Sequence, residues 1–270
     1  MVEISSKYKI GTRRFGSINW IGAWTLYKKE VLRFLNVWIQ TIFSPLISAL
    51  LFLLVLSLAI GTDKGNILGV PFINFLAPGL VAMQVIQQSF SHSASSFMIG
   101  KIQGNIVDIL YAPLSAGEVT MAITLAAVTR SVMIAFISIC IFYLIIDFEI
   151  KNYFTLIVFT FLSSFILGAL GIIAGLWAEK FDHMATVTNF IIVPLSFLSG
   201  TFYTIDRLPS YLQTISKGNP FFYMIDGFRY SFIGKSDGSL SVGLIYLTAL
   251  SFIMWLTAYL LYKKGYKIKS

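Results

Sequence analysis

The sequence predicts an all-α polytopic membrane protein with six transmembrane helices. Only 12% of its residues are charged, about half of the share found in soluble globular domains. Six long windows of the sequence contain no charged residue. Five of them reach the roughly 20 residues that a helix needs to cross the hydrocarbon core. The remaining window reaches this length when residues 119–131, which include Arg130, are added to it.

These windows place the spans within a single transmembrane domain that covers residues 1–270. We expect the spans over residues 38–60, 71–96, 119–146, 153–177, 185–204 and 239–262. A helix over residues 20–37 precedes them, and it mixes tryptophans and leucines with cations. Such a helix lies in the headgroup plane, with its apolar side toward the lipid chains and its cations toward anionic lipid. It either anchors the first span or also transmits motion to it.

Basic residues are distributed unevenly between the two sides of this topology. With six spans both termini share one side, and that side carries 13 lysines and arginines against 6 on the other. Loops on the cytoplasmic side are enriched in these cations, so we expect both termini to be cytoplasmic. The net charge of +8 is therefore interpreted as a topology signal, and no nucleic acid partner is expected.

The second expected span carries a stripe of polar residues at helical spacing. The stripe consists of Gln84, Gln87 or Gln88, Ser91 and Ser95. Such groups need partners in lipid, so the stripe faces either a neighbouring helix or the path of a substrate. His92 lies in the same region, but no second His, Cys or carboxylate occurs at ligand spacing, so no metal site is expected.

Two further features lie within the expected spans. Arg130 in the third span either snorkels back to the cytoplasmic headgroups or faces the bundle interior. The fourth span contains Gly168, Gly171 and Gly175, whose spacing offers a close contact with another helix.

The loops on the cytoplasmic side are expected at residues 97–118 and 178–184. In the first loop, Gly100 and Gly104 bracket the start of a short helix with an apolar face, and Pro113 ends it. This helix either lies flat on the membrane or is gripped by a cytoplasmic partner. The second loop is rich in charged residues and is either a solvated loop or a small polar docking point.

Residues 207–230 belong to the longest loop on the outer side and contain two short apolar repeats at helical spacing. Pro220 suits the first turn of the second repeat, and Phe221 begins its apolar face. At about ten residues each, neither repeat can span, so we expect a re-entrant helical hairpin that dips into the outer leaflet or lies across the span ends. Asp226 and Arg229 lie one turn apart and are placed to pair. The hairpin is either an aromatic lid over the bundle or an outer gate.

The chain contains no signature of a catalytic or energy-converting site. It has no G-x-x-x-x-G-K-[ST], no H-E-x-x-H and no G-x-S-x-G motif. Arg130 is the only charged residue within the expected spans, so the carboxylates that couple secondary transport to protons or sodium are missing. We therefore expect no catalytic residue, metal or cofactor on this chain, and the energy for active transport must come from another polypeptide.

Four segments resemble the membrane subunits of ABC-2-type ATP-binding-cassette exporters, which are bacterial permeases with six spans and cytoplasmic ends. The segments read APGLVAMQVIQQSF, GKIQGNIVDILYAPLSAGEV, VPLSFLSGTFYTIDRLP and GNPFFYMIDGFRY. The resemblance covers nearly the whole chain. It implies a homodimer of this chain in the bacterial inner membrane, with two copies of a separate P-loop ATPase that holds ATP and Mg.

The resemblance also implies roles for segments of the chain. Residues 100–113 resemble the coupling helix that contacts the ATPase, and residues 179–183 resemble a second contact. The candidates for ATPase coupling are Lys101, Gly104, Asp108, Pro113, Glu179 and Asp182. The candidates for a substrate path are Gln84, Gln88, Ser91 and Arg130. The candidates for the outer gate, within the re-entrant helices, are Pro220, Phe221, Asp226 and Arg229.

The leading hypothesis for function is an export permease that alternates between inward and outward openings and moves a drug, a lipid or a lipid-linked glycan. A passive channel or a membrane assembly factor without an ATPase is the alternative. A membrane enzyme acting on lipids would need a cluster of nucleophile, base or metal ligands, whereas His92 and His183 lie in different segments.

Overall fold

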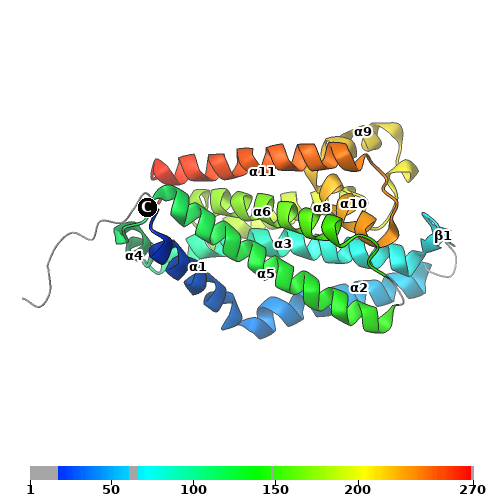
Figure 1. The fold of residues 1–270 in the computed structure, drawn as a ribbon, viewed down its shortest axis with the longest axis horizontal. Helices are drawn as coiled ribbons and strands as arrows, with labels where there is room; N and C mark the ends of the chain where they lie inside the picture. Colours follow the sequence, from blue (N-terminus) through cyan, green and yellow to red (C-terminus); the bar gives the residue numbers. More distant parts are fainter. Residues whose placement is uncertain (1–17, 61–65, 147–148, 269–270) are drawn as a thin grey trace, which may run out of the picture.

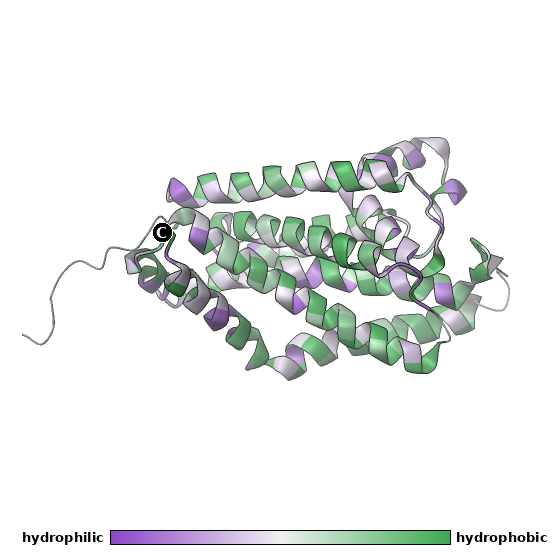
Figure 2. Ribbon diagram, in the orientation of Figure 1, coloured by the Kyte–Doolittle hydropathy of each residue, from purple (hydrophilic) through white to green (hydrophobic). Residues whose placement is uncertain are grey.

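The computed structural model describes residues 18–60, 66–146 and 149–268, which form an elongated bundle of helices (Figure 1). Six of the cations that set the expected topology lie outside the described residues. They are Lys7, Lys9, Arg13, Arg14, Lys64 and Lys269. Figure 2 shows hydrophobic residues along the lengths of the long helices, with hydrophilic residues mostly toward the two ends of the bundle.

The chain is almost entirely helical where it is described. The long helices are α1 (Trp20–Leu35), α2 (Ser44–Ile60), α3 (Phe72–Ile102), α5 (Ala116–Ile145), α6 (Tyr153–Trp177) and α11 (Leu240–Lys263). The shorter helices are α4 (Ile106–Tyr111), α7 (Phe181–Val187), α8 (Val193–Leu198), α9 (Ser210–Gly218) and α10 (Pro220–Ile233). Two π-helical segments, η1 (Ile39–Phe43) and η2 (Thr188–Ile192), continue into α2 and α8, and η3 (Ile205–Arg207) is a single 3₁₀ turn. Strands β1 (Asn66–Ile67) and β2 (Val70–Pro71) pair in an antiparallel hairpin.

The two ends of the bundle carry different elements (Figure 1). The first, here called the α4 end, carries α4, the start of α1 and the C-terminal end of α11. The second, here called the α9 end, carries α8, α9, α10 and the β hairpin. The segments between them are the long helices, so the bundle is built along one axis.

Within the described residues, five helices are long and apolar enough to cross a membrane. They cover Ile39–Ala59, Ala116–Ile145, Tyr153–Trp177, Phe181–Leu198 and Leu240–Lys263. Four of them agree with expected spans to within a few residues. The fifth was expected over residues 185–204 but ends at Leu198, because the chain turns through Gly200, whose φ of 78° is left-handed.

The expected span over residues 71–96 is not among these five. It corresponds to α3, whose glutamines, serines and His92 lower its hydropathy below that of α2, α5, α6 and α11. At 31 residues, α3 is about 46 Å long and is the longest helix described. It packs against α2, α5, α6 and α10, and most of its residues are buried. A helix that is enclosed by protein does not need an apolar surface all round.

The contact between α3 and α6 is close because α6 presents glycines. A Cβ atom on Gly171 would lie 2.5 Å from the backbone oxygen of Phe90, and one on Gly175 would lie 2.9 Å from that of Ala94. These separations are shorter than any ordinary Cβ contact, so the backbones of the two helices touch. The expected close helix contact of the fourth span is therefore confirmed, and α3 is its partner.

Replacing Gly171 with Ala should destabilise the bundle, because the new methyl group meets a backbone atom that cannot rotate away. We expect a loss of about 1–3 kcal/mol, measured as a lower Tm of the purified chain in detergent. The matched control is Gly218→Ala, where a Cβ atom meets nothing within 4 Å. Equal melting temperatures for the two variants would contradict the close α3–α6 contact.

Candidate functional site

A cavity of about 640 Å³ lies against α3, between α1, α2 and α5. Its polar lining consists of Arg33, Gln40, Thr41, Ser44, Ser48, Gln84, Gln87, Gln88, Ser91, Ser95 and Arg130. All four residues expected along a substrate path therefore line one cavity. For the three residues of α3, the spacing of three and four explains this arrangement, because such residues share one face of a helix.

Two of the three cavity-lining glutamines of α3, Gln84 and Gln88, also form hydrogen bonds to neighbouring helices. The Gln84 amide nitrogen donates to the backbone oxygen of Pro45 on α2, and its amide oxygen accepts from Ser138 Oγ on α5 at 2.9 Å. The Gln88 amide oxygen accepts a hydrogen bond from Arg130 Nη2 on α5. The two interpretations of the polar stripe are thus compatible, because the same side chains join helices and face the cavity.

Arg130 faces the bundle interior and does not snorkel to the headgroups. Its side chain is buried, with the residue 7% exposed, and it forms part of the cavity wall. It lies 14 residues into α5, about 21 Å from the start of that helix. Among the described residues, no Asp or Glu lies within ion-pair distance of its guanidinium.

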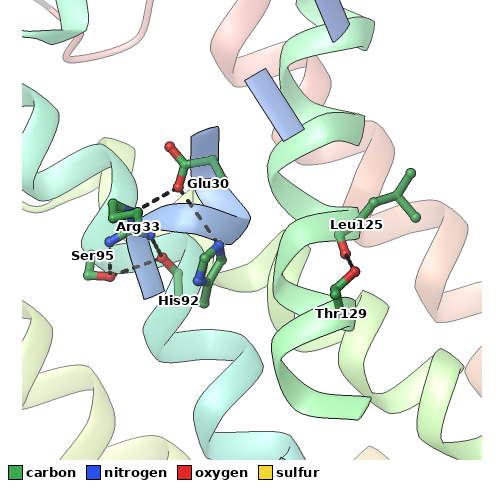
Figure 3. Close-up of polar contacts among 6 residues, drawn as sticks. All are labelled: Glu30, Arg33, His92, Ser95, Leu125 and Thr129. Atoms are coloured by element: carbon green, nitrogen blue, oxygen red, sulfur yellow. Dashed lines mark hydrogen bonds and ion pairs between the residues drawn. The ribbon is translucent and has the colours of Figure 1, made fainter. Parts of the chain in front are cut away.

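Next to the cavity-lining Arg33, α1 carries a buried carboxylate that was not identified as a candidate from the sequence. Glu30 accepts from Arg33 Nε at 2.9 Å, and His92 Nε2 lies 3.8 Å from the same carboxylate oxygen (Figure 3). Arg33 also donates to the backbone oxygen of His92 at 2.9 Å and to Ser95 Oγ at 3.2 Å. Glu30 lies four residues from both Leu26 and Phe34, which are also buried, so the spacing of α1 contained this signal.

These contacts dock α1 onto the bundle. A second contact joins the Tyr27 hydroxyl to Thr129 Oγ1 of α5 at 2.7 Å, and Thr129 itself donates to the backbone oxygen of Leu125 (Figure 3). The opposite face of α1 exposes Trp20, Ile21 and Trp24. The expected amphipathic pattern is therefore present, and its buried side forms part of the cavity.

At the α4 end, two of the expected coupling residues are engaged within the chain. Lys101 Nζ donates to the backbone oxygens of Leu176 at 2.8 Å and Ala178 at 2.6 Å, which belong to the C-terminal end of α6. A cation at this position stabilises a helix C-terminus because it satisfies free carbonyl groups. Glu179 forms an exposed ion pair with Lys267 at 2.7 Å. These contacts tie the ends of α3, α6 and the segment after α11 together.

The remaining coupling candidates are distributed around the same end. Gly104 lies in the turn between α3 and α4 with a left-handed φ of 74°, and a Cβ atom there would meet nothing within 4 Å. Asp108 and Asp182 are exposed in the first turns of α4 and α7, respectively. The backbone oxygen of Pro113 accepts from Asn19 Nδ2 at 2.9 Å, which links this loop to the start of α1.

Helix α4 presents an exposed apolar surface beside these residues. The surface consists of Val107, Leu110 and Tyr111, of which Tyr111 is 87% exposed, and the exposed Ile102 lies at the adjoining end of α3. The other side of α4 is held by Ile106, which is buried in a cluster with Phe97 and Val119. A firmly held short helix with an apolar outer face can be covered either by lipid or by another protein.

At the α9 end, the two expected short helices are present as α9 and α10. Asn219 caps α10, its Oδ1 accepting from the Phe221 backbone N–H at 3.1 Å, and Pro220 occupies the first turn as expected. Phe221 is buried, and α10 packs against α3, α6 and α11.

The expected pair between Asp226 and Arg229 is not formed. Asp226 instead accepts from the backbone N–H groups of Asp237 at 2.8 Å and Gly238 at 3.0 Å. The ion pair of Arg229 is with Asp237, at 4.0 Å. The prediction was wrong because it considered neighbours on one helix only. The loop after α10 folds back, and its residues Asp237 and Gly238 contact both side chains instead.

Arg229 is 1% exposed and joins several parts of the α9 end. Its Nη2 donates to the backbone oxygens of Gly200 at 2.7 Å and Thr201 at 3.2 Å. Its guanidinium also lies 3.9 Å from the centre of the Phe75 ring on α3, a cation–π distance. This arginine therefore fixes the turn after α8 and the loop after α10 to α3.

We predict that Asp237 gives the stability of this end a pH dependence. Burial raises the pKa of Asp237 from 3.8 to about 6, and the neighbouring Asp226 adds to this rise while Arg229 opposes it. The folded chain thus holds this proton more tightly than the unfolded chain. The stabilisation is complete below about pH 4 and is lost as the pH rises through about 6.

The test compares melting temperatures of the wild type and of Asp237→Asn between pH 4 and pH 7. The wild-type Tm should fall over this interval, and the variant should show a smaller fall. Asp182→Asn, which alters an exposed carboxyl group at the α4 end, is the matched control and should keep the wild-type slope. A slope that is unchanged in Asp237→Asn would contradict the prediction.

Comparisons with known proteins agree with this architecture. A family model described as ABC-2 type transporter matches residues 22–233, from within α1 to the end of α10. The chain is 30% identical over 240 residues to the inner membrane transport permease YadH of Escherichia coli strain K12, covering 87% of this chain and 94% of the relative. It is 25% identical over 223 residues to nodulation protein J of Rhizobium leguminosarum bv. trifolii, covering 81% and 83%, respectively.

The match includes every element that lines the cavity, together with α4 and the helices of the α9 end. Members of this family are membrane permeases that lack a catalytic site, and they pair with an ATPase that is a separate subunit. The resemblance seen in the four sequence segments is therefore confirmed. This chain belongs to the ABC-2 type transporter family and is a multi-pass, inner-membrane permease subunit of an ATP-binding-cassette transporter.

Proposed function

We propose that this permease exports an amphiphilic substrate across the inner membrane by alternating access, driven by ATP hydrolysis on its partner subunits. The observation that carries the proposal is the cavity beside α3. One wall has hydrogen-bonding side chains, and the same cavity includes Leu80, Met83, Phe52 and Phe202. A site with both surfaces suits a molecule with a polar part and an apolar part.

In this proposal α3 is the sixth span, and both termini are cytoplasmic. Its length of about 46 Å exceeds the ~30 Å of the hydrocarbon core, and it lies beside helices that are apolar enough to span. The described cations near the α4 end support a cytoplasmic location for it. They include Lys101, Lys180, Lys263, Lys264 and Lys267.

The ATPase would contact the α4 end, as the family resemblance implies. A partner that grips α4 would pull on α3 through the turn at Gly104. Lys101 would carry the same movement to α6, because it holds the C-terminal end of that helix. Asp108 and Asp182 are exposed and accessible to a partner, whereas Lys101 and Glu179 act within the chain.

The α9 end would act as the outer gate. A Cβ atom on Gly79 of α3 would lie 2.7 Å from the backbone oxygen of Thr201 and 2.9 Å from Arg229 Nη2. A displacement of α3 would therefore be transmitted to the turn after α8 and to α10. Pro220, Phe221 and Asp226 hold the start of α10 and the loop that follows it. Two copies of this chain, with two ATPases that hold ATP and Mg, would complete the transporter.

We predict that Val107→Asp weakens the association with the ATPase. Val107 is 42% exposed on the apolar surface of α4, so a carboxylate there should prevent burial by a partner without disturbing the fold. In a tagged purification from native membranes, the yield of co-purified P-loop ATPase and its hydrolysis should fall about tenfold or more. The Tm of the permease should not change.

Ile215→Asp is the matched control, because Ile215 is an exposed apolar residue of α9 at the opposite end. It should leave the ATPase yield at the wild-type level. If the wild-type chain purifies alone, without any hydrolysis, the exporter proposal is wrong. A passive channel or an assembly factor would then become the leading hypothesis.

A further inference from the structure

We propose that the cavity beside α3 is an anion site, and that the amphiphile it takes carries a phosphate or carboxylate headgroup received by Arg130. The presence of the site depends only on residues of this chain that the structure describes. Its role in selecting cargo rests on the proposed export function.

Arg130 is a buried cation without a counter-ion among the described residues. Its partner Gln88 is neutral, and its Nε atom is buried without a hydrogen-bond partner. Removing a guanidinium from water costs several kcal/mol unless a negative charge or several acceptors compensate. An anion in the cavity would provide this compensation.

Two other buried or half-buried arginines of the bundle show how the same fold treats a cation that has only a structural role. Arg33 pairs with Glu30 at 2.9 Å. Arg229 has Asp237, two backbone oxygens and an aromatic ring around it. Each therefore has a carboxylate from the chain, whereas Arg130 has none among the described residues. Gln88, the neutral residue that accepts a hydrogen bond from Arg130, lines the cavity.

The charges along the cavity leave a net positive site. Arg33 also lines the cavity, but Glu30 balances its charge. Arg130 then contributes one unbalanced positive charge to a cavity that Gln87 and Ser91, which are neutral hydrogen-bond donors on α3, also line. A guanidinium with neutral donors around it is the arrangement that binds phosphate or carboxylate oxygens.

The apolar part of the cavity is suited to the chain of the amphiphile. Cavity-lining residues of α3 extend from Leu80 to Ile99, which is about 28 Å of helix, and Gln88 lies near the middle. Toward the α9 end, the Phe202 ring lies 5.4 Å from that of Phe197 and 6.4 Å from that of Phe52. A headgroup at Arg130 would therefore lie in the middle of the cavity with its chain among these rings.

The experiment measures binding to the purified full-length chain in a neutral detergent at about 150 mM salt. The probes are dioctanoyl phosphatidate, dioctanoyl phosphatidylcholine and inorganic phosphate, and the readouts are the dissociation constant and the rise in Tm. We expect phosphatidate to bind at least about tenfold more tightly than phosphatidylcholine. Inorganic phosphate should bind weakly, because it cannot use the apolar part. Tight binding of inorganic phosphate would indicate that the site takes a soluble anion, and it would overturn the proposal that the ligand is an amphiphile.

Two variants test the role of Arg130. Arg130→Gln should remove the preference for phosphatidate, and Arg207→Gln, an exposed arginine outside the cavity, is the matched control that should keep it. Gln88→Glu places a carboxylate of the chain beside Arg130. We expect it to raise the Tm of the empty protein and to abolish the preference for phosphatidate, even if Arg130→Gln fails to fold.

A preference that survives in Gln88→Glu would overturn the proposal, because it would assign Arg130 a purely structural role. Equal binding of the two lipids by the wild type would do the same. ATP hydrolysis by the complex with the co-purified ATPase is measured in parallel. A wild type that shows no lipid preference but retains coupled hydrolysis refutes the anion site alone, whereas a wild type with the lipid preference but without an ATPase refutes the export function alone.

Discussion

The need to keep polar groups away from lipid determines how this bundle is built. Helix α3 carries glutamines, serines and a histidine over residues 84–96, and lipid chains offer such groups no hydrogen bonds. Helices α2, α5 and α6 are more apolar, and they pack around α3 together with α10. Exposed apolar side chains on α2 and α11, such as Leu54 and Phe252, face outward instead. The order of the layers therefore follows from the composition of each helix.

Helix α3 would not be held rigidly by side-chain packing alone. The glycines of α6 provide a close backbone contact with it. Because Gly171 and Gly175 carry no side chains, α6 approaches the backbone of α3 directly on one side. On its other side α3 faces a cavity. The helix is thus packed backbone to backbone against α6 and loosely against α2. A force applied along α3 would be carried by α3 and α6 as one unit, and the cavity wall would move with that unit.

The sequence was informative about elements and less informative about pairs of residues. Charge-free windows locate most of the long helices, since uninterrupted apolar runs of this length are typical of helices that cross a membrane. The position of α3 was found in the same way, although its polar side chains make it the least apolar of the helices that fill the expected spans. The cavity-lining set of α3 was predicted because helical spacing alone groups those residues.

Contacts between distant segments could not be predicted in this way. Glu30 was hidden among the cations of α1, and its carboxylate lies near His92, which comes from α3. The position of Asp237 depends on how the loop after α10 folds back onto that helix. Lys101 was expected to meet another protein, whereas the nearest carbonyl groups belong to the end of α6. Each of these pairings is set by packing between elements that local sequence does not encode.

The three regions for which we propose a function lie along a single helix. Lys101 ends α3 at the α4 end, Gln88 meets Arg130 in its middle, and Gly79 touches the turn at Thr201 at the α9 end. Binding energy at one of these points can reach the others only if α3 has two stable positions. The loose packing of α3 on the cavity side provides room for a second position. An anion at Arg130 would shift the equilibrium between the two positions of α3. It would stabilise the position that binds the anion more closely, because there the anion compensates the buried charge of Arg130.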